Sequence, residues 1–146
     1  MKQHIIGLIA ACALALGTAA CSTSTDSTST SAASTAPTAA VTTENFSGTV
    51  QVGGSDSNPF TVVLSGGVLN LTLTSAGPPA TIFMGFGAGT YVGTTCQLLT
   101  GGFLVTPAGT TPQISGTING GQYCVMVYDA GNQVAPITYS VTVTHY

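Results

Sequence analysis

The chain has 146 residues, only 3% of them charged, and a formal net charge of −3. Lys2 is its only lysine or arginine. Nucleic-acid binding and phosphoryl transfer both depend on cationic side chains that face phosphate groups. The composition therefore excludes both function classes, and the sequence contains neither a P-loop nor a dinucleotide-binding fingerprint.

The first twenty residues have the pattern of a secretory signal. Lys2 supplies positive charge, and Ile5 to Leu16 form an apolar run of about a dozen residues. Residues 18–20 are small, as cleavage requires. The run is shorter than the roughly 20 residues of a membrane-spanning helix. We therefore expect residues 1–20 to be a cleaved signal peptide.

Cys21 follows directly after Thr18-Ala19-Ala20, and this segment resembles a lipobox, in which the cysteine becomes the acylated first residue of the mature protein. Ser22 resembles the residue that sorts such proteins to the outer membrane. The resemblance implies a lipoprotein held by an N-terminal lipid at the outer membrane or cell surface. The alternative is ordinary cleavage after Ala20, which would leave Cys21 as a free thiol.

Residues 22–43 are almost wholly Ser, Thr and Ala and contain no aromatic residue. Such a segment cannot bury enough surface to offset its ordering entropy, so we expect a disordered tether. The predicted organisation is a signal peptide over 1–20, a lipidated cysteine and tether over 21–43, and one folded domain over 44–146.

Apolar and polar residues alternate repeatedly in residues 44–146, which is the period of strands with one buried face. The positions expected on buried faces are Phe46, Val50 and Val52; Phe60, Val62 and Leu64; Leu69, Leu71 and Leu73; and Ile137, Tyr139, Val141 and Val143. Weaker alternation predicts further strands at 82–86, 97–99, 103–105, 113–118 and 122–128.

Glycine and proline separate these segments. Ser65-Gly66-Gly67 and Asn119-Gly120 are expected as hairpin turns, because Asn-Gly suits a type I′ turn. Gly77-Pro78-Pro79 and Pro107 are expected to end strands. Eight or nine short strands in about a hundred residues, without helical spacing, predict an all-β fold with a single β-sandwich, jelly-roll-like or immunoglobulin-like.

Two of the four cysteines remain once the other two are accounted for, and these two are expected to form a disulfide. Cys12 leaves with the signal and Cys21 carries the lipid, so Cys96 and Cys124 remain in an oxidising compartment, where a disulfide is expected. The bridge would close a loop of about 29 residues and stabilise the domain by about 3.5 kcal/mol. Two buried free thiols are the alternative.

The last forty residues resemble the end of a bacterial pre-peptidase C-terminal domain. The resemblance rests on Gly121-Gln122-Tyr123 with Val127-Tyr128, followed by Tyr139-Ser140-Val141-Thr142-Val143. Phe60-Thr61-Val62 and the strand at 68–73 resemble earlier strands of that family, so the match spans residues 45–146. It implies a β-sandwich with an accessory or binding role, and some members of the family bind calcium. This chain differs in having Cys96 and Cys124.

After the signal, the charged or titratable candidates for catalysis are Asp26, Glu44, Asp56, Asp129 and His145. A catalytic triad would need His145 as its base, but a residue beside the last position is expected to be exposed and frayed. Asp56 and Asp129 both lie in turn-like composition. No residue is therefore assigned a catalytic role, and no cofactor or metal is assigned.

Two binding chemistries remain open. Asp56 with Asn58, or Asp129 with Asn132, could supply oxygen ligands to calcium, but turn roles are favoured.

Tyr91, Tyr128 and Tyr146 could form a stacking platform for sugars, but ordinary packing is favoured. The surface has no lysine to guard sheet edges, so pairing of an edge strand with another chain is a further expected binding mode.

The sequence thus predicts a noncatalytic, lipid-anchored module of the cell envelope that binds a protein or glycan partner or coats the surface. The alternative is a small secreted hydrolase, or a calcium-dependent accessory domain of an exported peptidase.

Overall fold

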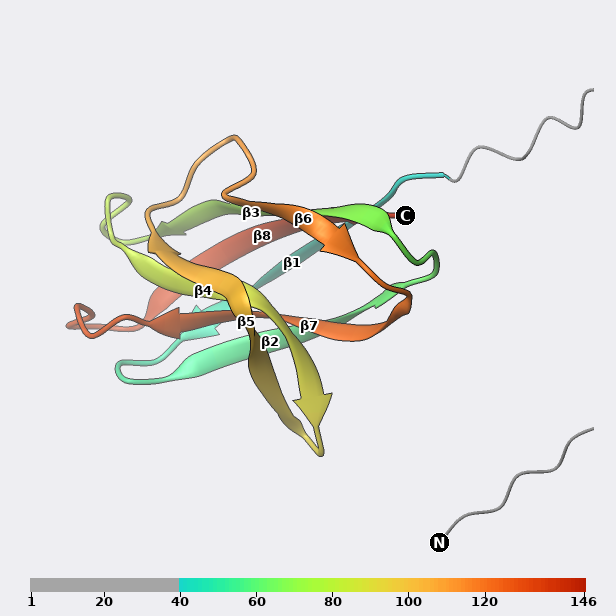
Figure 1. Ribbon diagram of the computed structural model, residues 1–146. Coiled ribbons are helices and arrows are strands. Elements are labelled where there is room, and N and C mark those ends of the chain that lie inside the picture. Colours follow the sequence, from blue (N-terminus) through green and yellow to red (C-terminus); the bar gives the residue numbers. More distant parts are fainter. Residues whose placement is uncertain (1–39) are drawn as a thin grey trace, which may run out of the picture. The chain divides into compact units, whose positions relative to one another are not determined.

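The computed structural model describes residues 40–146, which form two four-stranded antiparallel sheets (Figure 1). The strands are β1 (Thr42–Val50), β2 (Ser55–Val62), β3 (Gly67–Gly77), β4 (Met84–Val92), β5 (Thr95–Thr106), β6 (Ile114–Ile118), β7 (Gly121–Asp129) and β8 (Ile137–His145). The predicted all-β sandwich is confirmed. Within the described range, no helix is long and apolar enough to cross a membrane.

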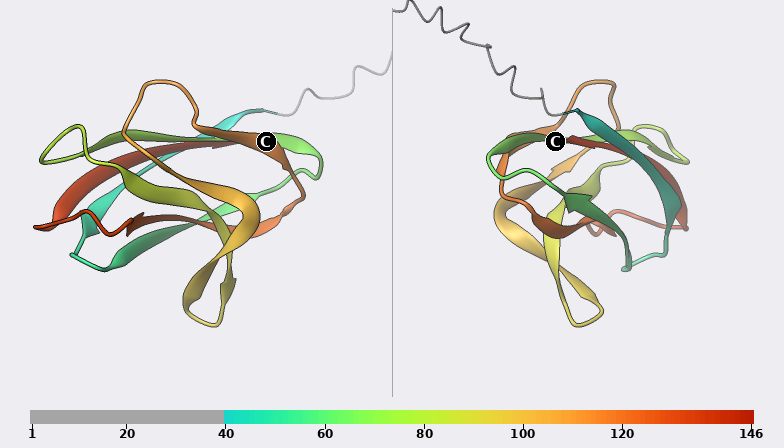
Figure 2. Two further views of the ribbon diagram at one scale, coloured as in Figure 1. Left: turned by 60° about the vertical axis from the view of Figure 1, so that its left-hand side comes forward. Right: turned by 90° about the vertical axis from the view of Figure 1, so that its right-hand side faces the viewer.

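The chain passes from one sheet to the other at almost every connection. One sheet has the strand order β1-β8-β3-β6 and the other has the order β2-β7-β4-β5. Only β4 and β5 are consecutive strands that pair with each other. This is the topology of a jelly roll, so the jelly-roll alternative holds and the immunoglobulin-like one does not (Figure 2).

The predicted hairpin turns are wrong. Residues 65–67 lead from β2 to β3, and Asn119-Gly120 lead from β6 to β7, so both connect different sheets. No non-glycine residue in the described range has a positive φ, which a type I′ turn would require of Asn119. The one hairpin turns at Gly93, whose φ is 64°. Turn composition marks where the chain reverses, but not which sheet the next strand joins.

The alternation of apolar residues predicted most of the core. Every residue expected on the buried faces of the strands at 69–73 and 137–143 is buried. Val52 and Leu64 were expected to be buried, but they are 54% and 45% exposed. They are exposed because β1 ends at Val50 and β2 ends at Val62, so both residues lie in connections.

Several strand boundaries differ from prediction, three of them with a structural reason. β1 begins at Thr42, two residues before the expected start of the domain. The segments 97–99 and 103–105 belong to one strand, β5, which a register shift interrupts between them. β4 continues to Val92, well past the predicted end at residue 86. The prediction stopped short because glycines weaken the apolar pattern of this strand.

Those glycines bring neighbouring segments unusually close to β4. Gly85, Gly87 and Gly89 alternate with the buried residues Met84, Phe86 and Ala88. A Cβ at Gly85 would collide with the Tyr128 ring, and one at Gly89 would collide with the Gln97 carbonyl. The missing side chains therefore let Tyr128 and β5 pack directly on the β4 backbone.

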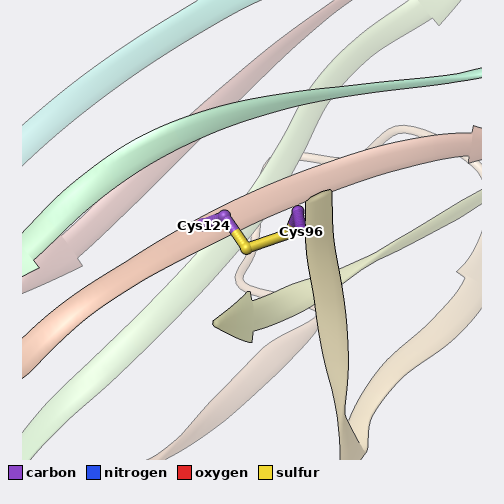
Figure 3. Close-up of a disulfide and its surroundings, with 2 residues drawn as sticks. All are labelled: Cys96 and Cys124. Carbon is purple, nitrogen blue, oxygen red and sulfur yellow. A yellow bond between two sulfur atoms is a disulfide. The ribbon is translucent and has the colours of Figure 1, made fainter. Parts of the chain in front are cut away.

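The predicted disulfide is present between Cys96 in β5 and Cys124 in β7 (Figure 3). These strands are not neighbours, because β4 lies between them. Gly89 of β4 pairs with Cys124, and a Cβ there would lie 3.0 Å from the Cys96 sulfur. The bridge thus passes over Gly89 and fastens the β4–β5 hairpin, whose tip projects from the sandwich in Figures 1 and 2.

Candidate functional site

The two ends of the sandwich are built differently. At one end, which we call the loop end, lie the connections 51–54, 78–83 and 130–136. The strand register places them together, because Val50 pairs with Ile137 and Met84 pairs with Asp129. At the opposite end, the closed end, the start of β1 pairs with the end of β8, and the connections 63–66 and 119–120 cross between sheets.

Asp129 fastens two connections of the loop end to each other. Its Oδ2 accepts a hydrogen bond of 2.8 Å from the Gly53 N–H. Its Oδ1 accepts bonds of 2.7, 3.1 and 3.3 Å from the N–H groups of Gly131, Asn132 and Gln133. These bonds, the Gly53 one above all, hold the pKa of Asp129 below its usual value against a smaller opposing effect of desolvation. The expected turn role of Asp129 is confirmed.

A hollow of about 360 Å³ lies beside Asp129 on the outer face of the β2-β7-β4-β5 sheet. It is shallow and mixes polar with apolar side chains. Its lining residues are Gly53, Gly54, Ser55, Leu98, Met126, Tyr128 and Asp129.

A second hollow, of about 270 Å³, lies between the connections 78–83 and 130–136. Its lining residues are Pro78, Pro79, Thr81, Ile82, Phe83, Asn132, Val134, Ala135 and Ile137. Phe83 is 50% exposed and Val134 is 96% exposed. Large apolar side chains that gather in the open around a hollow are typical of a binding surface. The loop end is therefore the candidate functional site.

His145 lies at the closed end, and its predicted exposure is wrong. The side chain is only 1% exposed, and its Nε2 lies 2.9 Å from Oε1 of Glu44. Its ring packs against Phe60, with the ring centroids 5.7 Å apart. β8 does not fray, because Thr42 pairs with His145. The alternation that buries residues 137–143 continues to position 145, and this signal could have located His145 inside.

Asp56 was expected in a turn but lies in β2, and it is partly buried between the sheets. The Tyr139 hydroxyl donates to Asp56 Oδ2 at 2.9 Å, and the Asn58 side-chain amide donates to the same hydroxyl at 3.0 Å. Gly48 leaves the space that this contact needs. Burial, together with the nearby Asp56 carboxylate, raises the pKa of Tyr139 far above its usual value.

The three carboxylates of the described range thus lie apart, and each is bound within the fold. Neither expected calcium pair converges on free oxygens, since Tyr139 lies between Asp56 and Asn58 and the Asp129 carboxylate accepts backbone N–H bonds. Nowhere in residues 40–146 do three His, Cys, Asp or Glu side chains gather in a metal-binding group. Cys21 and Asp26 lie outside the described residues.

The three candidate tyrosines do not form one platform. Tyr128 lies against Gly85 in one sheet, whereas Tyr146 lies against Gly67 at the start of β3 in the other. Tyr91 pairs with Cys96 in the β4–β5 hairpin. The favoured expectation, that these tyrosines pack separately, agrees with these positions.

No protein-family model matches the sequence, and a comparison with curated proteins finds no match either. Among solved structures, the chain is similar to the crystal structure of Aeromonas hydrophila PliG, a periplasmic lysozyme inhibitor of g-type lysozyme. The two are 13% identical with a TM-score of 0.49, over 71% of this chain and 86% of that one. A likeness at this level assigns no function to individual residues.

Proposed function

We propose that residues 40–146 form a noncatalytic module that binds another protein through the loop end. The observation that carries the proposal is the exposure of Phe83 and Val134 around an apolar hollow, one of whose two loops is held by the Asp129 hydrogen bonds. Because the Asp129 hydrogen bonds order the backbone before a partner arrives, binding costs less conformational entropy.

The positions of the titratable side chains support a noncatalytic role. A general base must come within hydrogen-bond reach of the substrate, but His145 is 1% exposed and bound to Glu44. Asp56 is bound to Tyr139, and the Asp129 carboxylate accepts four backbone N–H bonds. Among residues 40–146, no Asp or Glu carboxylate lies beside a second one to form an acid–base pair.

The chemistry of the second hollow favours a protein over a glycan. Its exposed large apolar side chains, Phe83 and Val134, offer no hydrogen-bonding group, and neither Asp nor Glu lines this hollow. Apolar and aromatic anchors at the centre of an interface supply much of the binding energy between proteins. Thr81 and Asn132 are the only polar side chains among its lining residues, so a hydroxyl-rich sugar would leave most of its polar groups without partners there.

The attachment to a membrane is part of the same proposal. Cys21 would carry the lipid and residues 22–43 would act as the tether. The described chain enters β1 at the closed end, so the tether would be attached at the end opposite the loop end. The intact mass of the exported protein should exceed that of the chain from Cys21 by its acyl groups. A bare mass, or unchanged localisation of Cys21→Ser, would argue against the anchor.

We also propose, from the residues alone, that the domain is related to the pre-peptidase C-terminal domains. In that case the partner would include an exported peptidase. Identification of the captured partner tests this part separately from the binding surface itself.

The binding surface can be tested by placing a photo-crosslinking amino acid at Val134 of the full chain in living cells. Val63 is the matched control, because it is 78% exposed and lies in the closed-end connection 63–66. We expect a discrete adduct with one protein at Val134 and none at Val63. Equal adducts at both positions, or no adduct at Val134, would overturn the proposal.

A further inference from the structure

Four strands lie at sheet edges and present unpaired backbone N–H and C=O groups. These strands are β1 and β6 in one sheet and β2 and β5 in the other. Natural proteins guard such edges with charges that point inward, with proline, or by keeping the edge strand short. The four edges of this sandwich can be compared on that basis.

Three of the four edges carry such a guard. In β1, Glu44 turns inward to His145. In β2, Asp56 turns inward to Tyr139, and Pro59 removes one backbone donor. β6 is only five residues long.

β5 carries none of these three guards, and its register shift, which can also blunt an edge, affects it only before Phe103. It is twelve residues long and contains no charged residue and no proline. Phe103 and Val105 alternate with Leu104 and are 48% and 51% exposed. A long, uncharged edge with exposed apolar side chains is a ready template for another strand.

We propose that a second copy of this chain pairs with β5 in antiparallel register over residues 103–106. A register shift interrupts β5 before Phe103, so the regular edge begins there. With Leu104 on a twofold axis, Phe103 of each copy would lie opposite Val105 of the other. Aromatic and β-branched residues make favourable cross-strand pairs.

Two properties of residues 103–106 favour a second copy of this chain, over a different protein, as the strand that pairs with β5. A twofold interface needs a patch that complements itself, and a pairing centred on Leu104 meets that condition. Glu44, Asp56 and Asp129, the acidic residues of the described range, lie outside β4 and β5, so two copies bring no like charges together at this edge. Because the paired segment is short, the interface is small, and the dimer should dissociate on dilution.

This inference does not depend on the loop end. Sedimentation equilibrium of the full chain tests it, with Val105→Lys as the breaking variant. Val68→Lys is the matched control, because Val68 is 46% exposed and lies on β3, which has a partner strand on both sides. We expect a concentration-dependent dimer for the parent chain and Val68→Lys. Association of Val105→Lys should be weaker by roughly tenfold or more, because the interface would have to take in a charge.

A photo-crosslinking residue at Phe103 tests the register without relying on the folding of a lysine variant. The expected product is a dimer joined between residue 103 of one copy and the peptide around Val105 of the other. A parent chain that stays monomeric at all concentrations would overturn the inference. Equal weakening by the two lysine substitutions, or crosslinks only to a different protein, would overturn it as well.

Discussion

Both ends of the sandwich expose apolar side chains, but the loop end gathers them around a hollow, whereas the closed end buries a hydrogen-bonded histidine. At the closed end a histidine is buried and bound to Glu44, while at the loop end Phe83 and Val134 stand in solvent. A buried polar group needs a partner to avoid a desolvation penalty, so the closed end contributes to stability. Exposed apolar side chains contribute little to folding, so substitution of Phe83 or Val134 should leave the stability of the domain nearly unchanged.

The loop end nevertheless has ordered backbone. Asp129 supplies one carboxylate to four N–H groups on two connections, so the order does not depend on burial of Phe83 or Val134. On the proposed function, stability and recognition would depend on different residues. Substitutions at the two ends should therefore have separable effects.

The largest effect is expected between the two ends, at the disulfide. Cys96→Ala with Cys124→Ala should lower the free energy of unfolding by about 3.5 kcal/mol, since the closed loop no longer restricts the unfolded chain. Chemical denaturation measures this loss, and reduction of the parent chain is the control. A loss below about 1 kcal/mol would mean that the bridge adds little to the fold.

The next largest effect is expected at the closed end. His145→Ala should cost about 2–3 kcal/mol, because it leaves a cavity beside Phe60 and removes the partner of Glu44. His145→Gln keeps a donor and should cost less. Crosslinking from Val134 should persist in both variants at a temperature where they are folded. If His145→Ala lowered crosslinking from Val134 as well as stability, the effects at the two ends would not be separable.

A smaller effect on stability is expected from Asp129→Asn. The charged acceptor is lost, so the amides of Gly53 and residues 131–133 should exchange faster with solvent while the β8 amides stay protected. The folded pKa lies below the usual 3.8, so the contribution is complete at neutral pH and is lost as pH falls through the folded value. Parent and variant should differ by a constant amount above about pH 5, and the difference should shrink below about pH 4 until the two converge below the folded pKa. A difference that grows on acidification would contradict this assignment.

The smallest effect on stability is expected from Val134→Lys. The side chain is 96% exposed, so the free energy of unfolding should change by less than about 0.5 kcal/mol. Thermal denaturation followed by circular dichroism measures the change. A larger loss would show that Val134 contributes to the fold, and its exposure would then need another explanation.

Much of the sandwich was predictable from local pattern. Strict alternation located β8 and the buried part of β3, because one face of each strand packs in the core. The elimination of cysteines led to the Cys96–Cys124 pair. The length of β4 was not predictable, because glycines at 85, 87 and 89 have no side chain and so do not contribute to an apolar–polar alternation.

The candidate site was less predictable, because it depends on contacts distant in sequence. Asp129 was expected in a turn, but its bond to Gly53 spans 76 residues. His145 was misplaced because chain ends commonly fray, a tendency that pairing with Thr42 overrides. Phe83 and Val134 carry no local signal of exposure, since the topology alone brings their connections to one end.

The proposed function requires that the loop end, and not the rest of the surface, binds the partner protein. Competition tests it most directly: the adduct formed from Val134 in envelope preparations is measured while excess unlabelled full chain is added. We expect the parent chain and Val63→Lys to suppress the adduct and Val134→Lys not to suppress it. Equal suppression by all three chains would contradict it.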